Sequence, residues 1–229
     1  MKIFPALFAS LLLCAAQPAI AADCMDLSGT GLKTAGGRLA ADFAPASIEG
    51  KAALRVTPQR TGTDGLVILP LDGFRDGEIR LKVWSELRPD ASLDARGFAG
   101  LAFRIKADAK AFDYFYVRPD NARAASQVRR NHSLQYASYP DHPWEVLRKA
   151  EPGKYESYAD MGLGEWIGIR ALVKDGAAQF YINGALHPSL VVEDLKLAPG
   201  SGTVGLWVGP GTVAHFADVC VMRSPLPQA

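Results

Sequence analysis

The sequence predicts an all-β protein, a sandwich or barrel with one short helix. Short runs rich in β-branched and aromatic residues recur along the chain, and Gly, Pro, Asn and Asp separate them. Apolar and polar residues alternate within several of these runs, which is typical of strands that bury one face. No long stretch after the N-terminal segment shows the apolar period of a helix. Strands at this spacing are typical of sandwiches and barrels.

The first half of the chain supplies five of the predicted strands. The clearest is Glu78–Trp84, in which three apolar residues face one side while Arg80 and Lys82 face the other. This alternation predicts a half-buried antiparallel strand. The other four runs are Lys51–Thr57, Leu66–Leu71, Gly97–Lys106 and Phe112–Val117.

The second half contains the clearest hairpin. Asp175-Gly176 separates the alternating runs Glu165–Val173 and Ala177–Ile182, and the glycine accepts the positive φ that a tight turn needs. Asn183-Gly184 predicts the next turn for the same reason. Further strands are predicted at Ser133–Ser138, Trp144–Arg148, Lys154–Tyr158, Thr203–Val208 and Val213–Met222.

One segment departs from the strand pattern. Asp120–Arg130 opens with an Asp that can cap a helix N-terminus, and it is rich in alanine. These features predict one short helix.

The composition describes an ordinary globular protein. Hydrophobic residues make up 48% of the chain, which excludes a disordered protein. Because 25 basic side chains balance 24 acidic ones, a nucleic-acid partner is not expected. No linker or change of composition divides the chain after the N-terminal segment. Residues 22–223 are therefore predicted to form a single domain, and residues 224–229 a flexible tail.

The N-terminus has the pattern of a secretory signal peptide. Lys2 precedes the apolar run Ile3–Ala16, and Ala19-Ile20-Ala21 offers small residues for cleavage. The apolar run is shorter than the roughly 20 residues of a membrane span. We therefore predict cleavage after residue 21, no membrane span in the cleaved protein, and a periplasmic or secreted location.

Cleavage leaves two cysteines, Cys24 and Cys220, near opposite ends of the chain. An even number of cysteines in an exported protein favours a disulfide, which would place the first and last strands side by side. Two unpaired buried thiols are the alternative.

Most familiar catalytic patterns are absent from the sequence. It contains no phosphate-binding loop of the G-x-x-x-x-G-K-[ST] type, no H-E-x-x-H or C-x-x-C metal spacing, and no G-x-S-x-G nucleophile motif. These absences argue against several classes of nucleotide-dependent, zinc-dependent and serine-dependent enzymes.

Polar and aromatic side chains are concentrated between Phe112 and Tyr158. This segment contains six of the seven tyrosines, together with several arginines and histidines. Arg, Asn and His supply hydrogen bonds, while Tyr and Trp supply flat apolar faces, a combination that suits a carbohydrate or a sugar acid. The candidate binding residues are Arg118, Asn121, Arg129, Arg130, Asn131, Tyr139 and Trp144, and the candidate catalytic residues are His132, His142 and Tyr136.

A structural explanation competes with this interpretation for each residue taken singly. Tyr and Trp on strands are often packing residues, and Arg129 and Arg130 could simply complement the negative end of the predicted helix. His215 is expected to be a core or edge histidine. Trp207 is expected in the core, with a place on a concave face as the alternative.

Several segments resemble the 3-keto-disaccharide hydrolase-like domain family. The resemblance is carried by Gly97–Lys106 (GFAGLAFRIK), Tyr114–Asn121 (YFYVRPDN) and Val128–Tyr136 (VRRNHSLQY), and it extends over roughly residues 77–221. It implies a two-sheet jelly-roll sandwich of the concanavalin A-like, laminin-G-like type, with carbohydrate bound at its concave face. The E-x-D-x-x-E strand of related glucanases is absent.

The resemblance also raises the question of a metal. Laminin-G relatives often bind calcium, but the stretch Asp113–Asp120 does not have the pattern of a calcium loop. We therefore predict no cofactor, and leave a divalent metal open.

Three functions follow from these observations. The first is an exported module that binds a carbohydrate or sugar acid through the polar and aromatic face. The second is a glycoside-cleaving enzyme with His132 or His142 as base, Tyr136 or Tyr139 as acid, and Arg129 or Arg130 as oxyanion partner. The third is a non-catalytic adhesion module of the cell envelope. A cleft at this face would favour the first two functions, and a flat surface the third.

Overall fold

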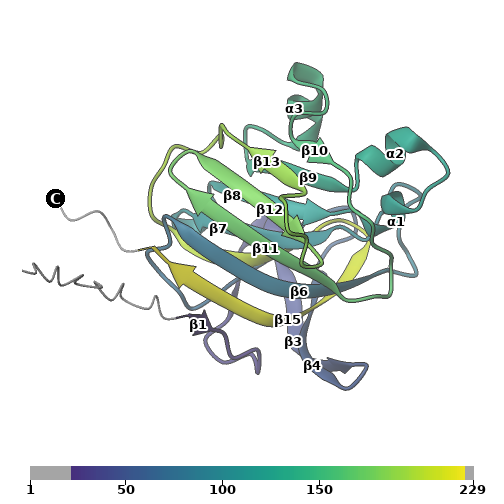
Figure 1. Cartoon of the computed structure of the whole chain (residues 1–229). Helices are drawn as coiled ribbons and strands as arrows, with labels where there is room; N and C mark the ends of the chain where they lie inside the picture. Colours follow the sequence, from purple (N-terminus) through teal and green to yellow (C-terminus); the bar gives the residue numbers. More distant parts are fainter. Residues whose placement is uncertain (1–21, 225–229) are drawn as a thin grey trace, which may run out of the picture.

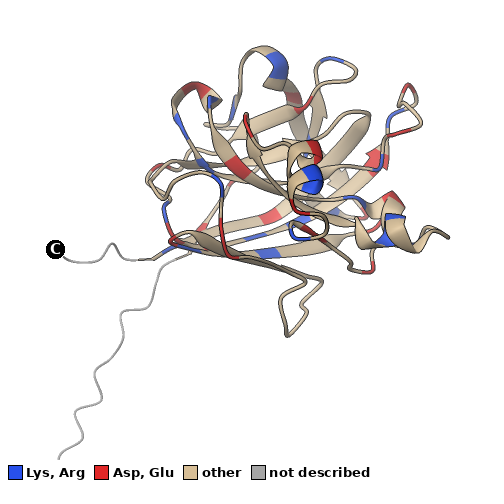
Figure 2. Cartoon of the chain, turned by 90° about the horizontal axis from the view of Figure 1, so that it is seen from above, with Lys and Arg blue, Asp and Glu red and all other residues tan. Residues whose placement is uncertain are grey.

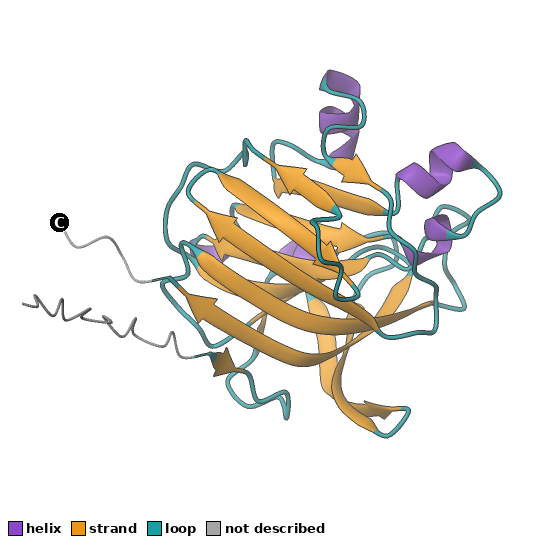
Figure 3. Ribbon diagram, in the orientation of Figure 1, coloured by secondary structure: helices purple, strands orange, loops and turns teal. Residues whose placement is uncertain are grey.

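Two antiparallel sheets packed face to face form the body of the protein, as the computed structural model shows (Figure 1). The structure describes residues 22–224; the predicted signal peptide and residues 225–229 of the predicted tail lie outside this part. The arrangement confirms the predicted all-β, two-sheet jelly-roll sandwich. A few short helices accompany the strands (Figure 3).

The first sheet has the strand order β13-β12-β11-β6-β15-β4-β3, and β1 also pairs with β15. Its strands are β1 (Asp23–Cys24), β3 (Ala41–Ile48), β4 (Lys51–Pro58), β6 (Gly77–Leu87), β11 (Ile167–Lys174), β12 (Ala177–Ile182), β13 (Leu190–Val192) and β15 (Thr212–Arg223).

The second sheet has the order β10-β9-β8-β7-β14-β5-β2. Its strands are β2 (Lys33–Thr34), β5 (Gly65–Ile68), β7 (Ala99–Ile105), β8 (Phe112–Val117), β9 (Leu134–Tyr139), β10 (Glu156–Ser157) and β14 (Thr203–Val208). The α-helices are α1 (Pro119–Ala122), α2 (Gln127–Asn131) and α3 (Trp144–Ala150), with 3-10 turns at Gly37–Leu39 and Ala107–Ala109.

The core lies between the two sheets. Phe115 of β8 stacks on Phe180 of β12, with ring centroids 4.1 Å apart, and both side chains are fully buried. Because side chains alternate along a strand, the neighbours Tyr114 and Tyr116 point to the other face of the second sheet. This alternation places two aromatic rings on the outer face of that sheet.

The segment predicted as a strand at Trp144–Arg148 is a helix, α3, so that prediction is wrong. Pro143 precedes its first turn, Glu145 lies in that turn, and Arg148 and Lys149 lie in the last turn. These charges complement the helix dipole, and only Leu147 is buried. The alternation that predicted a strand is weaker evidence here than these end signals.

The single helix predicted over 120–130 is two helices of about one turn each. The first, α1, starts with Pro119 at its first position rather than with Asp120 as a cap. The second, α2, starts after Ser126, whose hydroxyl accepts a hydrogen bond from the Arg129 amide. The three α-helices gather at one end of the sandwich (Figure 3).

Two further differences concern edge strands. The segment predicted at Lys154–Tyr158 pairs only over Glu156–Ser157. The sequence analysis misses β3 as well as the short strands β1, β2 and β13. β3 contains Pro45, which lacks an amide donor and is tolerated there because β3 is the last strand of its sheet.

The predicted disulfide is present. Cys24 and Cys220 face each other in the antiparallel pair of β1 and β15 and are covalently linked. The bond joins residues 196 apart in the sequence. It therefore fixes the start of the described chain to its last strand.

Acidic and basic residues are interspersed over the ribbon (Figure 2). Residues of opposite charge are therefore mixed and do not occupy two separate regions of the ribbon. None of the helices within residues 22–224 has the length and apolar character needed to cross a membrane.

Candidate functional site

A pocket of about 890 Å³ opens on the outer face of the second sheet. Its volume lies in the upper part of the range typical of small-molecule sites, roughly 300–1,000 Å³. The loop 62–64, the loop 92–98, the α1–α2 segment and α3 with its preceding loop supply its walls. The structure thus has a cleft here rather than a flat surface.

Three aromatic side chains, Tyr114 and Tyr116 of β8 and Trp207 of β14, form what we call the aromatic floor of the pocket. The Tyr116 and Trp207 ring centroids are 4.6 Å apart, and those of Tyr114 and Trp207 are 5.1 Å apart. Trp207 is only 3% exposed. Trp207 is therefore buried, but it lines the pocket on the outer face of the second sheet instead of lying between the two sheets.

The aromatic floor exists because a glycine lies between its members. Gly100 of β7 pairs with Trp207 on one side and with Tyr116 on the other. A Cβ at Gly100 would lie 2.6 Å from the Tyr116 Cα and even closer to the backbone of Phe115. The missing side chain allows β8 to lie close to β7 and leaves the space above Gly100 open for the Tyr116 and Trp207 rings.

Arg118 connects the floor to the wall of the pocket. Its guanidinium is nearly buried, and it donates hydrogen bonds to the Tyr116 hydroxyl (2.9 Å) and to Glu156 (3.1 Å). It also lies against the Trp144 ring, 5.3 Å from its centroid. Aromatic faces and a carboxylate thus hold this cation in one position.

Glu156 is the carboxylate that the basic side chains at this end of the pocket approach. Arg118, Arg148 and His132 all approach its carboxylate, which is almost completely buried. Burial would raise the pKa of Glu156, but the hydrogen bonds and charge of Arg148, with Arg118 and His132, hold it below its usual value. The carboxylate is therefore ionised near neutral pH.

His132 lines the same end of the pocket. Burial lowers the pKa of its imidazole, and the nearby charges of Arg148 and Arg118 lower it further, while Glu156 opposes them. Near neutral pH the ring is mainly neutral and can both donate and accept hydrogen bonds.

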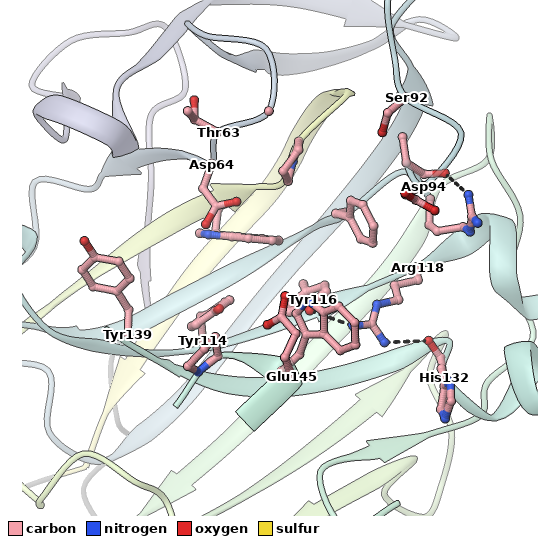
Figure 4. A pocket seen from close by; sticks show the side chains of 18 of the residues that line it. Thr63, Asp64, Ser92, Asp94, Tyr114, Tyr116, Arg118, His132, Tyr139 and Glu145 are labelled. Carbon is pink, nitrogen blue, oxygen red and sulfur yellow. Dashed lines mark hydrogen bonds between the residues drawn. The ribbon is translucent and has the colours of Figure 1, made fainter. Parts of the chain in front are cut away.

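The opposite end of the pocket is acidic (Figure 4). Asp64, in the loop before β5, and Glu145, in the first turn of α3, both line it. Burial raises the pKa of Asp64 to about 6; the Trp207 indole and Arg38 oppose this increase, and Glu145 adds to it. The Trp207 N–H acts from nearby, without the geometry of a hydrogen bond.

Six of the predicted residues line this pocket. They come from β9, α3 and the α1–α2 segment with its flanking cap residues, which the fold brings to one end of the second sheet. They are Arg118, Asn121, Arg129, His132, Tyr139 and Trp144.

Tyr136, a candidate catalytic residue, lies between the sheets and does not line the pocket. It is fully buried, donates a hydrogen bond to Asp113 (2.7 Å) and accepts one from the Lys196 amide (2.6 Å). In strand β9 it points to the same side as Phe115, its register partner in β8. Its surroundings are those of a structural tyrosine.

Three other predicted residues do not line the pocket. Arg130 stacks on Tyr158, 5.2 Å from its ring centroid. Asn131 accepts a hydrogen bond from Gln127 within α2. The backbone of His142 pairs with Ser138. The structure therefore does not assemble Tyr136 or His142 with His132 as an acid and base.

Sequence reasoning does not find Asp64, Glu145 or the loop 92–98. The Asp64-Gly65 pair marks only a turn before a strand. That this turn overhangs the aromatic floor depends on β5 pairing with β14, a long-range contact. Glu145 is missed because its segment is predicted as a strand.

The sequence analysis leaves a divalent metal open, because laminin-G relatives often bind calcium. Within residues 22–224, no group of three or more His, Cys, Asp or Glu side chains is placed to hold a metal ion. Both oxygens of Glu156 accept internal hydrogen bonds, while Asp113 accepts them through one oxygen only.

Comparison with solved structures shows the fold alone. The carbohydrate binding module CBM66 from Bacillus subtilis is 15% identical, with a TM-score of 0.55, covering 83% of this chain and 94% of that chain. The exoplasmic/lumenal domain of VIP36, in a form bound to Ca²⁺ and Man3GlcNAc, is 11% identical, with a TM-score of 0.51 and coverages of 88% and 86%. A galectin-like protein of unknown function from Bacillus subtilis is 12% identical, with a TM-score of 0.50 and coverages of 87% and 96%. No family model matches the sequence, and no curated protein matches it.

Proposed function

We propose that this protein is an exported module that binds a carbohydrate in the pocket on its second sheet. The observation that carries the proposal is the aromatic floor, surrounded by charged and polar side chains in a pocket of about 890 Å³. A sugar has C–H groups on its faces and hydroxyls at its edges, so flat rings and polar walls suit it together.

Further support comes from the form of the pocket and from the fold. A cleft suits a small ligand better than it suits a flat adhesive contact. Two of the similar structures carry carbohydrate in their names, a binding module and a glycan-bound lumenal domain. We extend the proposal to residues 22–223 as one module, with residues 1–21 as a signal peptide and a periplasmic or secreted location. The disulfide agrees with an oxidising compartment.

The first experiment is a binding screen with the cleaved protein. Thermal stabilisation, followed by calorimetry, would be measured against tetrasaccharides of β-1,4-glucan, β-1,3-glucan, β-1,4-xylan, α-mannan and chitin, and against oligouronates. We expect at least one of these to stabilise the protein. If no member of the panel stabilises or binds the protein, the proposal is overturned.

The variant Trp144→Ala locates the binding. Trp144 lines the pocket and is only half-buried, so its removal takes away a stacking face without opening the core. We expect binding to weaken about tenfold, which corresponds to about 1.4 kcal/mol. Trp166→Ala is the matched control, since Trp166 is equally half-buried but packs on Trp84 of the other sheet. Equal losses in both variants would contradict binding at this pocket.

A further inference from the structure

The charged groups at the two ends of the pocket differ in how they are neutralised. At the basic end, Arg118 and Arg148 pair with Glu156, and Arg96 and Arg129 approach Asp120. These guanidinium groups are thus already held by carboxylates of the protein. A carboxylate on a ligand would have to compete with Glu156 and Asp120 for them.

The acidic end has no such pairing. Within residues 22–224, neither Asp64 nor Glu145 has a Lys, Arg or His nitrogen within 4.0 Å. Arg38 is the one pocket arginine without an ion pair in that part of the chain, and it is exposed at the rim. It lies near enough to oppose the increase in the pKa of Asp64, but not near enough to neutralise the carboxylate.

Both carboxylates act on the aromatic floor. Burial is the main reason why the pKa values of Tyr114 and Tyr116 are raised, and the negative charges of Asp64 and Glu145 add to it in both cases. The two acids come from different walls, the loop before β5 and helix α3, and Figure 4 shows both directed into the pocket. Arg118 opposes them and lies against Tyr116, so a group that rests on Tyr114 and Trp207, away from Arg118, meets negative charge from two sides.

A second observation at this end comes from Trp207. Its side chain lines the pocket and is 97% buried, and its indole N–H lies near Asp64 without completing a hydrogen bond, so the Asp64 carboxylate stays free to accept hydrogen bonds from a ligand. The face of an indole carries negative charge density and attracts cations. Carboxylates and ring faces thus favour the same kind of group.

We propose that the pocket selects a sugar that carries a free ammonium group, an amino sugar, with the ammonium between Asp64 and Glu145 over Tyr114 and Trp207. An ammonium donates three hydrogen bonds and neutralises the negative charge of the two carboxylates. A hydroxyl donates one hydrogen bond and leaves both charges in place, and a sugar acid adds a third like charge. This inference rests on the proposed function, because it names the class of sugar for the same pocket.

The test compares amino sugars with their N-acetyl derivatives, in which an acetyl group replaces the charge of the ammonium. The probes are glucosamine, galactosamine and mannosamine, each beside its N-acetyl derivative, with binding measured by ligand-observed NMR and calorimetry at low and high salt. We expect at least one amine to bind ten times more tightly than its N-acetyl partner, with the preference shrinking at high salt.

Two substitutions assign that preference to the acidic end. Asp64→Asn and Glu145→Gln keep the shapes of the side chains and remove their charges, so each should reduce the preference to less than threefold. Glu193→Gln is the control, because Glu193 is exposed and does not line the pocket. Thermal denaturation of every variant would show that each is folded.

The outcomes are distinct. If no amine binds better than its N-acetyl partner while a neutral tetrasaccharide stabilises the protein, the inference is overturned and the proposed function stands. A preference that survives both substitutions also overturns it. If neither the tetrasaccharides, the oligouronates nor the amines bind, the proposed function fails.

Discussion

Asp64 is a pocket carboxyl whose environment raises its pKa towards neutral pH. Burial raises its pKa from 3.8 to about 6, so the folded protein binds a proton more readily than the unfolded chain does. Stability must then fall as the pH rises from about 4 to about 6, and the cost is fully present above pH 6. The pocket thus carries a charged group at the expense of stability, which is typical of functional sites.

Replacing Asp64 with Asn should relieve this cost. We expect Asp64→Asn to increase the free energy of unfolding by about 1–3 kcal/mol at pH 7.5, with the gain shrinking towards zero as the pH falls to 4. Denaturation at both pH values measures it. Asp72→Asn is the control, because Asp72 is exposed. An equal gain at pH 4 and pH 7.5 would show that the charge of Asp64 is not the cause.

Single residues also show how far the sequence predicts the candidate site. Arg118, His132 and Trp144 belong to a local concentration of polar and aromatic residues, and the structure places them in the pocket. Tyr136 belongs to the same concentration, but it points between the sheets because side chains alternate along β9. Asp64 joins the site only through the long-range pairing of β5, which no local pattern reveals.

At the scale of elements, patterns predict strands better than they predict the segments around the pocket. The boundaries of β8, β12 and β14 agree with the sequence analysis, because each has strong alternation or a clear turn beside it. α3 is short, and its aromatic and β-branched residues also suit a strand. Its Pro143 start and basic last turn decide the matter in favour of a helix.

The close contact of β7 with β8 gives a prediction at this scale. We expect Gly100→Ala to destabilise the protein by about 1–3 kcal/mol, because the added Cβ meets the backbone of Phe115 and Tyr116. Chemical denaturation measures the loss, and sugar binding should weaken with it as Tyr116 shifts. Gly176→Ala is the control, since Asp175, not the expected Gly176, has the positive φ of that turn, and a Cβ at Gly176 meets nothing within 4 Å. Equal stability of both variants would contradict this account of the floor.

For the molecule as a whole, turns and alternation predict an all-β sandwich or barrel because they recur along most of the chain, and the family resemblance implies the two-sheet jelly roll. The sequence does not predict the order of strands within each sheet, in which β6 lies between β11 and β15, far from both in the chain. That order depends on which apolar faces fit together across the core. The pocket is a product of this order, since its floor joins β8 and β14.

The disulfide between Cys24 and Cys220 affects the stability of the whole molecule. Replacing Cys24 and Cys220 with Ala should lower the free energy of unfolding by about 2–5 kcal/mol, because the bond closes a very long loop in the unfolded chain. Denaturation of this variant, and of the unmodified protein with and without reductant, measures the loss. A reductant effect that persists in the double variant would point to another cause.

The pairing of β1 with β15 has a consequence for the connectivity of the chain. Asp23 and Val221 are register partners in adjacent strands, so the two ends of the described chain lie about one strand spacing apart. A short linker could join them. The backbone could instead be opened in the exposed loop 183–187, between β12 and β13 at the edge of the first sheet. The result would be a circular permutant with the same sheets and the same pocket, whose fold depends on which strands meet and not on which is made first.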